Sequence, residues 1–400
     1  MAATKLVREG KPDEALAQIR KVAASHPEWP APMLILARMH FASGQSDRGR
    51  VLLEDASAES PDDPSVALTF AAIDLAEGRR HNAKLNADHA LVLASKLKDP
   101  SQIPPVVRDA QKILAGVAET RKDWASARDH LVAALASEPK DGATRQALGR
   151  VLFKIGDLDG AYRELTAATK DAPALDPPDL TMAQLHARSG DEAKAIEWFD
   201  RAIKNQPKAA RPRIAYALWL LEQGKPEAAK PLADEAAALE PEAKEPRKLR
   251  GLIAFHLRDL PVAEAIYESL LKDTPTDPGT ANYLALCLVD QQDRAKRLKG
   301  LQLAENLARQ LPRSPEILAT LGHAHDRNGH PQDAEINLRA AVSSGRAAPD
   351  TAYFLARVLA DRGKPDEARK LLVAAIGQTG LFAYRKEAND LLKTLPAPPR

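Results

Sequence analysis

The stretch 176-DPPDLTMAQLHARSGDEAKAIEWFDRAIKNQP-207 decides the fold, because it contains one complete copy of a unit that recurs along the chain. Its first half has an apolar stripe with the helical spacing of three and four: Leu180, Ala183 and Ala187. Gly190 follows, where a positive φ would end that helix. Its second half has another such stripe: Ala195, Phe199 and Ala202. The unit is therefore predicted to be a pair of short helices.

A small residue marks the same position in every copy of the unit. The series is Ala15, Gly49, Ala83, Ala127, Ala161, Ala195, Ala229, Ala263, Gly300, Ala334 and Ala368. Eight of the ten steps in it are 34 residues, and the other two are 44 and 37. A closing proline lies twelve residues after most of them, at Pro27, Pro61, Pro139, Pro173, Pro207, Pro241, Pro275 and Pro312. Because the small residues and the closing prolines recur at a fixed distance from each other, they indicate an array of repeats.

A pair of short helices cannot bury its own apolar stripe, so neighbouring pairs must cover it. The predicted units are 1–29, 30–63, 64–104, 108–141, 142–175, 176–209, 210–243, 244–277, 278–314, 315–348 and 349–382. A polar helix over 383–395 is expected to cap the array, and 396–400 is expected to be a tail. No strand pattern with a period of two is present, so the predicted fold class is all-α.

The period and the order of small, glycine, aromatic and proline positions resemble the tetratricopeptide repeat. The units at 142–173 and 176–207 match best, and the resemblance covers roughly residues 1–382. It implies a right-handed superhelical solenoid of about eleven helix-turn-helix repeats plus a C-terminal capping helix. It also implies that the first helix of each repeat lines a concave groove that binds protein or peptide.

Composition excludes several classes of protein. The chain of 400 residues has 57 basic and 55 acidic side chains and a net charge of +2, which is not the strongly basic balance of a nucleic-acid-binding surface. No apolar run is long enough to insert into a membrane. The single cysteine, Cys287, has apolar neighbours and is expected to be buried and inert. Phosphate-binding and serine-nucleophile motifs are absent, so neither catalysis nor a cofactor is predicted.

The stretch 322-GHAHDRNGH-330 is the one local candidate for a metal site. His323 and His325 are two positions apart, so on a helix they point in different directions, whereas helical zinc pairs are spaced by four. No metal site is therefore predicted. His325 is expected to be packed, and His323 is expected to face the groove.

Two insertions interrupt the period. The first, near 95–105, is expected to extend one helix and then form a loop, either a tolerated loop or a contact site. The second, near 293–300, is expected to be a basic turn, either simply solvated or a docking site for an acidic partner. At the ends, residue 1 falls inside a first helix, which suggests a fragment of a longer chain, whereas the C-terminus resembles a native cap.

Repeat phase predicts the residues that line the groove and bind the partner. They are Lys112, Gln146, Arg150, Phe153, Gln184, Arg188, Arg211, Lys248, Asn282, His323, Tyr353 and Arg357. One hypothesis is that Arg150 and Arg188 bind an acidic peptide through bidentate ion pairs; the alternative is an ordinary solvated face. A clamp for a C-terminal carboxylate, known in one tetratricopeptide subfamily, is not expected, because no asparagine occupies its first-helix position.

The predicted function is a protein- or peptide-binding scaffold in a bacterial multiprotein assembly, for example of the envelope or of an export system. The alternative is the recognition arm of a larger enzyme whose catalytic domain lies outside this chain. Self-association through terminal repeats is a further hypothesis. The sequence leaves the compartment open between the cytoplasm and, after removal of an N-terminal signal or anchor, the periplasm.

Overall fold

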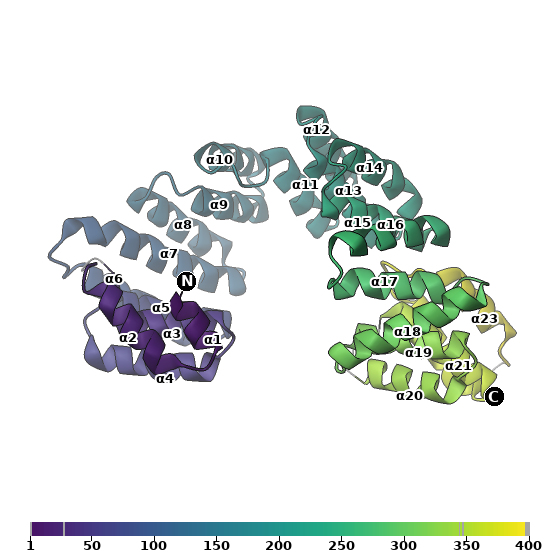
Figure 1. Cartoon of the computed structure of the whole chain (residues 1–400). Coiled ribbons are helices and arrows are strands. Elements are labelled where there is room, and N and C mark those ends of the chain that lie inside the picture. Colours follow the sequence, from purple (N-terminus) through teal and green to yellow (C-terminus); the bar gives the residue numbers. More distant parts are fainter. Residues whose placement is uncertain (1, 27–28, 344, 346–347, 397–400) are drawn as a thin grey trace. The chain divides into compact units, whose positions relative to one another are not determined.

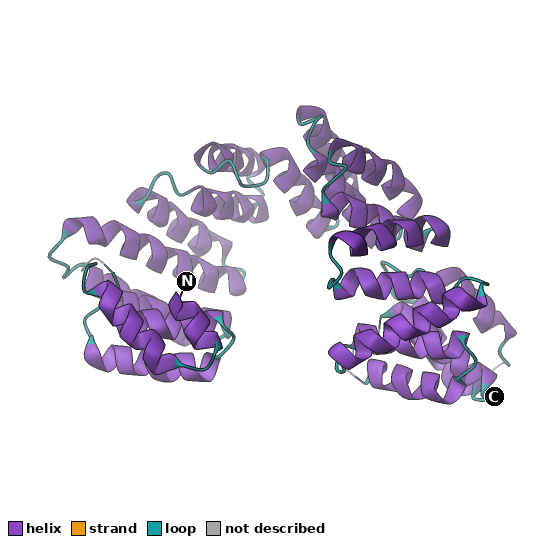
Figure 2. Cartoon of the chain, in the orientation of Figure 1, coloured by secondary structure: helices purple, strands orange, loops and turns teal. Residues whose placement is uncertain are grey.

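The structure is a computed structural model, and it describes residues 2–26, 29–343, 345 and 348–396. These residues form 23 α-helices and one short 3₁₀ helix, and no strand occurs among them (Figure 2). The predicted all-α class is therefore confirmed. The chain divides into two units, residues 1–195 and 196–400, and each is described by itself.

The first unit is built from short helices joined by tight turns, in the order shown in Figure 1. They are α1 (Ala2–Arg8), α2 (Pro12–Ala23), α3 (Pro32–Ala42), α4 (Ser46–Glu59), α5 (Pro64–Ala76), α6 (Arg80–Ala94), η1 (Pro100–Gln102), α7 (Ile103–Thr120), α8 (Trp124–Ser137), α9 (Gly142–Ile155), α10 (Leu158–Asp171) and α11 (Pro178–Ser189). The division between the units falls inside α12 (Glu192–Asn205).

The second unit has the same construction. Its helices are α13 (Ala210–Glu222), α14 (Pro226–Leu239), α15 (Lys244–His256), α16 (Leu260–Asp273), α17 (Pro278–Val289), α18 (Arg294–Gln310), α19 (Pro315–Arg327), α20 (Pro331–Val342), α21 (Pro349–Asp361), α22 (Pro365–Ile376) and α23 (Arg385–Thr394). Each first helix packs on the second helix of its pair. The first helices α13, α15, α17, α19 and α21 also contact one another in series, and we call them the first-helix layer of this unit.

The small residues of the repeat lie where two helices of a pair approach most closely. All nine alanines of the series are 0% exposed, and Gly49 and Gly300 are buried as well. A Cβ atom on Gly300 would lie only 2.6 Å from Cγ1 of Val289. The predicted reason for a small residue at this position is therefore confirmed. Cys287 is 0% exposed, and burial raises the pKa of its thiol, as expected for an inert cysteine.

Most turns between the two helices of a pair use the predicted glycine with a positive φ, for example Gly190 at 81°. Three repeats lack this glycine. In two of them Lys122 (φ 58°) and Arg258 (φ 59°) adopt the same left-handed conformation, whereas the turn between α17 and α18, all of whose residues are described, contains no residue with a positive φ. Such a conformation costs a non-glycine residue roughly 1–2 kcal/mol. In those two repeats the packing of the helices therefore imposes this conformation although the sequence provides no glycine. The closing prolines of the described residues lie in the turns that follow second helices, and Pro27 lies outside those residues.

Both insertions lengthen helices. The first adds the short η1 turn and makes α7 18 residues long. The lengthened helix therefore follows the inserted loop, whereas the sequence predicted that it would precede the loop. The second makes α18 17 residues long. The prediction of a basic turn at 293–300 is therefore wrong. Lys296 and Lys299 lie on the first turns of α18 and form ion pairs of 2.7 and 2.8 Å with Glu264 and Glu268 of α16.

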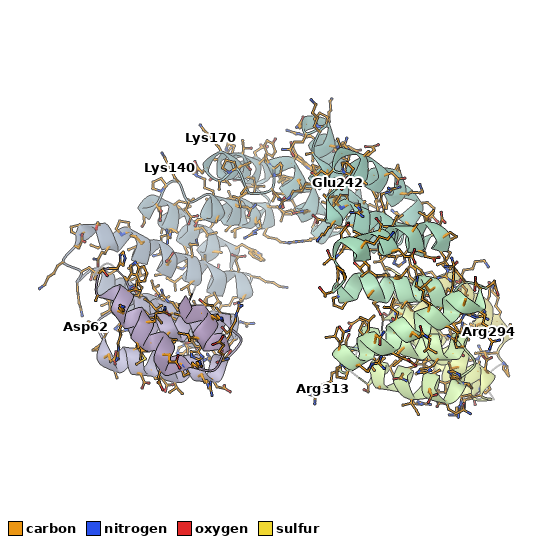
Figure 3. The ribbon with its side chains drawn as sticks, viewed as in Figure 1. Asp62, Lys140, Lys170, Glu242, Arg294 and Arg313 are labelled. Atoms are coloured by element: carbon orange, nitrogen blue, oxygen red, sulfur yellow. The ribbon has the colours of Figure 1, made fainter. Side chains whose placement is uncertain are left out.

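Side chains at the ends of helices point into solvent (Figure 3). The exposed charged residues labelled there are Asp62, Lys140, Lys170, Glu242, Arg294 and Arg313. No helix among the described residues is both long and apolar enough to cross a membrane.

The C-terminal segment returns to the first-helix layer of the second unit. The backbone of Gly380 lies against Glu222 and Gly224, at the end of α13. Phe382, Ala383 and Tyr384 are buried, and α23 follows within the predicted 383–395. We call residues 377–384 the crossing segment. Residues 397–400 of the predicted tail lie outside the described residues.

Candidate functional site

Two adjoining cavities open on the first-helix layer of the second unit. The first, the aromatic cavity, has a volume of about 420 Å³ and is lined from α15, α17, α19, α21 and the crossing segment. Its walls include Phe255, Asn282, Tyr283, Phe354 and Tyr384. Such a cavity is large enough for one or two side chains of a bound chain.

The second, the apolar cavity, has a volume of about 470 Å³ and is lined mainly from α13, α15 and α17. Its walls include Ile214, Leu218, Leu249 and Leu252. Both cavities have Gly279 and Tyr283 in their walls. They therefore adjoin at α17, and we call the two cavities together the unit-2 groove.

A series of aromatic contacts joins the two cavities. Tyr267 stacks on Tyr283 with ring centres 5.5 Å apart, and Tyr283 meets the ring of Phe255 edge-on at 5.6 Å. Phe255 in turn lies 6.1 Å from the ring of Tyr384. Because buried aromatic rings lose little entropy when a ligand binds, they form a rigid apolar floor.

Polar groups lie at defined points of this groove. Oδ1 of Asn282 is buried and has no hydrogen-bond partner. At the rim, Lys248 forms an ion pair with Asp277, which also caps α17. Burial raises the pKa of Asp350 to about 7 and lowers the pKa of His256 to about 4, so His256 is neutral at pH 7.

The part of the groove predicted around His323 is filled by the protein itself. His323 is 0% exposed, donates from Nε2 to Oδ1 of Asp290 at 2.7 Å, and stacks on Phe354 with ring centres 3.9 Å apart. Its assignment to the groove is therefore wrong, as is the expectation that His325 is the packed member of the pair, since His325 is only partly buried. Burial lowers the pKa of His323 to about 4, so the neutral ring makes these contacts.

Two other predicted residues of the last repeats are also engaged internally. Tyr353 is 6% exposed because its ring stacks on Tyr384 at 5.5 Å. Arg357 forms an ion pair with Asp326, and burial lowers the pKa of its guanidinium. The crossing segment therefore covers Tyr353, whereas Arg357 is engaged by the ion pair with Asp326 of α19.

Lys248 and Asn282 are the predicted residues that lie in the unit-2 groove, together with Ile214 and Tyr283, which the same phase argument selects. Arg211 is exposed on the first turn of α13. In the middle of this unit the repeat phase therefore selects helix faces that line the two cavities. It fails where the chain folds back.

In the first unit the predicted residues lie on α7, α9 and α11. Arg150 and Arg188 are exposed, and Gln146 and Gln184 are half-buried. The ring of Phe153 packs edge-on against His186, with ring centres 4.8 Å apart. The charge of Arg150 acts on Glu119, where burial nevertheless raises the pKa of the carboxyl group.

A separate cavity of about 500 Å³ lies between α3, α5 and α7 in the first unit. Lys112, a predicted residue, lines it and pairs with Asp141 at 3.1 Å. Arg38 also lines it, and donates to the hydroxyl of Thr69 at 2.8 Å and to the carbonyl of Ser65 at 3.3 Å. Arg38 occupies the first-helix position at which the carboxylate-binding subfamily has an asparagine. In this repeat that position therefore serves internal packing.

Sequence reasoning missed Phe255, His256, Phe354 and Tyr384 as residues of the groove. Phe255 lies three periods of 34 residues after the predicted Phe153, so repeat phase does provide a signal for it, and His256 is the next residue of α15. Tyr384 precedes the last helix, outside every repeat, so the repeat provides no signal for it. The cluster of aromatic residues in 353–354 and 382–384 was the only available hint.

Comparison with known proteins agrees with the fold. Three family models described as tetratricopeptide repeat match residues 6–79 and 118–179, residues 217–278 and 320–380, and residues 180–208. The chain belongs to the tetratricopeptide repeat family. The residues matched include most helices of both units, so the family and the solenoid fold are established. No curated protein matches this tetratricopeptide repeat chain in sequence.

Among solved structures, a tetratricopeptide repeat protein from Parabacteroides merdae is 16% identical, with a TM-score of 0.50 over 64% of this chain and 98% of that one. A thermophilic tetratricopeptide repeat protein from Thermus thermophilus is 21% identical, with a TM-score of 0.40 over 46% and 100%. Yeast Tom70 is 17% identical, with a TM-score of 0.39 over 98% and 93%. The first of these similarities supports the fold alone. Tetratricopeptide repeats in general form scaffolds that bind proteins.

Proposed function

We propose that the second unit binds an extended segment of another protein in the unit-2 groove. The observation that carries this proposal is that the two cavities adjoin at Gly279 and Tyr283 and together have walls from five successive first helices. A binding scaffold is favoured over an enzyme because the groove presents apolar surface and one unpaired acceptor. The apolar surface of the groove also favours a peptide ligand over a nucleic acid.

The size of the groove sets the length of the ligand. Packed helices lie about 8–10 Å apart, so five of them span roughly 35 Å. An extended chain advances about 3.3–3.6 Å per residue, so about ten residues cross the layer. Side chains of an extended segment point alternately to opposite faces, so every second one can enter a cavity.

The chemistry of the groove sets the composition of the ligand. Leu218, Leu249 and Leu252 favour an aliphatic or aromatic side chain in the apolar cavity. Oδ1 of Asn282 is buried without a hydrogen-bond partner, and a rotation of this side chain, which lines the aromatic cavity, lets it accept a hydrogen bond from a backbone N–H of the ligand. The proposed ligand is therefore an apolar segment held partly through its backbone.

Selection from a displayed library of random twelve-residue peptides on the full chain tests this proposal. Selected peptides should be rich in apolar residues, and their affinity can be measured by fluorescence anisotropy. Leu218→Ser should weaken binding by about tenfold, because a lost apolar contact is worth about 1.5 kcal/mol or more. Asn282→Ala should weaken it by about fivefold to tenfold.

Val373→Ser is the matched control for Leu218→Ser. Val373 is also an exposed apolar side chain, 57% exposed on the second helix α22, outside both cavities. Equal loss of affinity in both variants, or peptides whose binding ignores both cavities, would contradict the proposal.

The setting of this scaffold is the finer part of the proposal. Long repeat arrays of Ala-, Arg- and Pro-rich composition are consistent with a bacterial multiprotein assembly of the envelope or export kind. The alternative is the recognition arm of a larger enzyme. The full-length gene separates the two: a catalytic domain beside the repeats supports the arm, and a signal or lipid anchor supports the envelope scaffold.

A further inference from the structure

Two histidines and an aspartate meet at the turn between α19 and α20. His325 lies in the last turn of α19, His330 precedes α20, and Asp333 lies in the first turn of α20. The rule that two zinc-binding histidines on one helix are spaced by four residues does not apply here, because these residues lie on two different helices. The turn brings them together, with Gly329 at φ 83° between them.

The separations of the three residues suit a small divalent metal ion. Nδ1 of His325 lies 3.5 Å from Nδ1 of His330, and one potential ligand atom from each of the three residues lies within 4.8 Å of the others. Zinc bonds of about 2.0–2.1 Å in a tetrahedron place neighbouring ligand atoms about 3.3–3.4 Å apart. The histidine pair already has this spacing, and the exposed carboxylate needs only a small side-chain movement.

A direct contact between the two rings does not explain the arrangement as well. A nitrogen–nitrogen distance of 3.5 Å lies at the limit of a hydrogen bond and beyond its usual range of 2.7–3.2 Å. The ring planes are inclined by 53°, so the rings do not stack either. Neither a short hydrogen bond nor ring stacking therefore accounts for the approach of the two nitrogens.

The electrostatic surroundings favour a cation. The charged groups that act on His325 are the carboxylates of Asp333 and Glu305 and the ring of His330. Glu305 belongs to α18, so three helices contribute to this environment.

The turn is held in place by contacts that need no metal. Nδ2 of Asn328 donates to the carbonyl oxygens of Ala324 at 2.8 Å and Arg297 at 3.2 Å. The backbone N–H of His330 donates to the carbonyl of His325 at 2.9 Å. The backbone that carries the three residues is therefore positioned before a metal binds, which lowers the entropic cost of binding.

We propose that His325, His330 and Asp333 bind one zinc ion or a similar divalent transition metal. Two imidazoles and one carboxylate leave a fourth tetrahedral position for water or for a ligand from a partner. This site lies on the turn between the helices of one pair and is independent of the unit-2 groove.

Titration of the chelator-treated full chain with Co²⁺ and with Zn²⁺ tests the proposal. One Co²⁺ per chain should bind with the intense visible absorption of tetrahedral coordination, and Zn²⁺ should displace it. His325→Gln/His330→Gln should weaken binding by about 100-fold, and Asp333→Asn by about tenfold or more. Zn²⁺ should raise the melting temperature of the parent chain but not that of the double variant.

His81→Gln/His89→Gln is the matched control, because both histidines are exposed on α6 and the same number of imidazoles is lost. Binding that is equally weakened in the control, or a Co²⁺ spectrum that is unchanged in the His325/His330 variant, would overturn the site. Should the double variant fold poorly, His330→Gln and Asp333→Asn alone decide the question, since both side chains are exposed.

Discussion

The phenol of Tyr384 donates a hydrogen bond of 2.6 Å to Oδ2 of Asp290, although 94 positions separate the two residues in the sequence. Arg258 pairs with the same carboxylate at 2.7 Å and lies over the ring of Tyr384, and His323 donates to the other oxygen. Burial opposes the ionisation of Asp290, but His323, Arg258 and Tyr384 outweigh it and lower its pKa. This network fastens the crossing segment to α17.

Removing the hydroxyl of Tyr384 should show how much its hydrogen bond to Asp290 contributes to stability. Tyr384→Phe should lower the free energy of unfolding by about 1.5–3 kcal/mol, because a hydrogen bond to a buried charge is lost. In a double-mutant cycle with Asp290→Asn, the coupling energy should be about 0.5–3 kcal/mol. Urea unfolding followed by circular dichroism provides the four values. Strictly additive effects would show that the two residues do not interact.

The sequence predicted the fold well because the repeat is redundant. The close approach of the two helices of each pair requires a small residue at one position. Eleven copies of that position make the requirement visible in the sequence. The left-handed turns at Lys122 and Arg258 show the limit of local reasoning, since there the stacked neighbours impose a conformation that the residue itself disfavours.

The candidate site was less predictable, because it depends on contacts between distant segments. Repeat phase selects Lys248 and Asn282, which line the two cavities of the second unit. It could not anticipate that Tyr384, outside the repeats, would cover Tyr353 and bury the network of His323. Likewise, His325 and His330 are brought together by a turn, which helical spacing rules do not describe.

Asp350 should give the second unit a distinctive pH dependence. Burial raises its pKa to about 7, whereas an unfolded aspartate titrates near 3.9. Between these values the folded chain binds more protons than the unfolded chain, so this group's contribution to stability falls as pH rises from about 4 to 7. Backbone N–H groups of Tyr384 and Ala383, and the charges of Arg258 and Glu387, also act on this carboxyl group.

The variant Asp350→Asn isolates this effect, because the amide oxygen can still accept from the N–H of Tyr384. The difference in unfolding free energy between variant and parent should change in the variant's favour by up to about 1.4 kcal/mol per pH unit between pH 4 and 7. His256 and His323, whose lowered pKa values of about 4 give the opposite slope, are present in both chains. A difference that stays constant over this range would contradict the raised pKa of Asp350.

Gly322 should tolerate no side chain. A Cβ atom there would lie 2.5 Å from Cγ of Leu338, in the interface between α19 and α20. Gly322→Ala should therefore destabilise the chain by about 1–3 kcal/mol, despite the better helix propensity of alanine. Gly279→Ala is the control, since its Cβ would meet only Oδ1 of Asp277 at 3.5 Å. Urea unfolding should leave the control unchanged or slightly more stable, and equal loss in both variants would show that close packing is not the cause.

Arg150 and Arg188 provide a separate test of the first unit, where an acidic peptide is the predicted ligand. Both side chains are exposed on first helices, whereas nearby Arg145 is already paired with Glu164 and Asp171. Arg150→Ala/Arg188→Ala should weaken binding of a labelled glutamate-rich dodecapeptide by about tenfold or more, because charge-assisted contacts are lost. The loss should diminish as salt is raised.

Lys140→Ala/Lys170→Ala removes the same charge from exposed residues that lie in the turn after α8 and at the end of α10 (Figure 3). It should leave the affinity for this peptide within about twofold of the parent, since a surface charge outside the contact is largely screened. If both double variants lose affinity equally, net charge and not recognition explains the binding. If neither does, the inner face around Arg150 is an ordinary solvated surface, and recognition by this chain lies in the unit-2 groove alone.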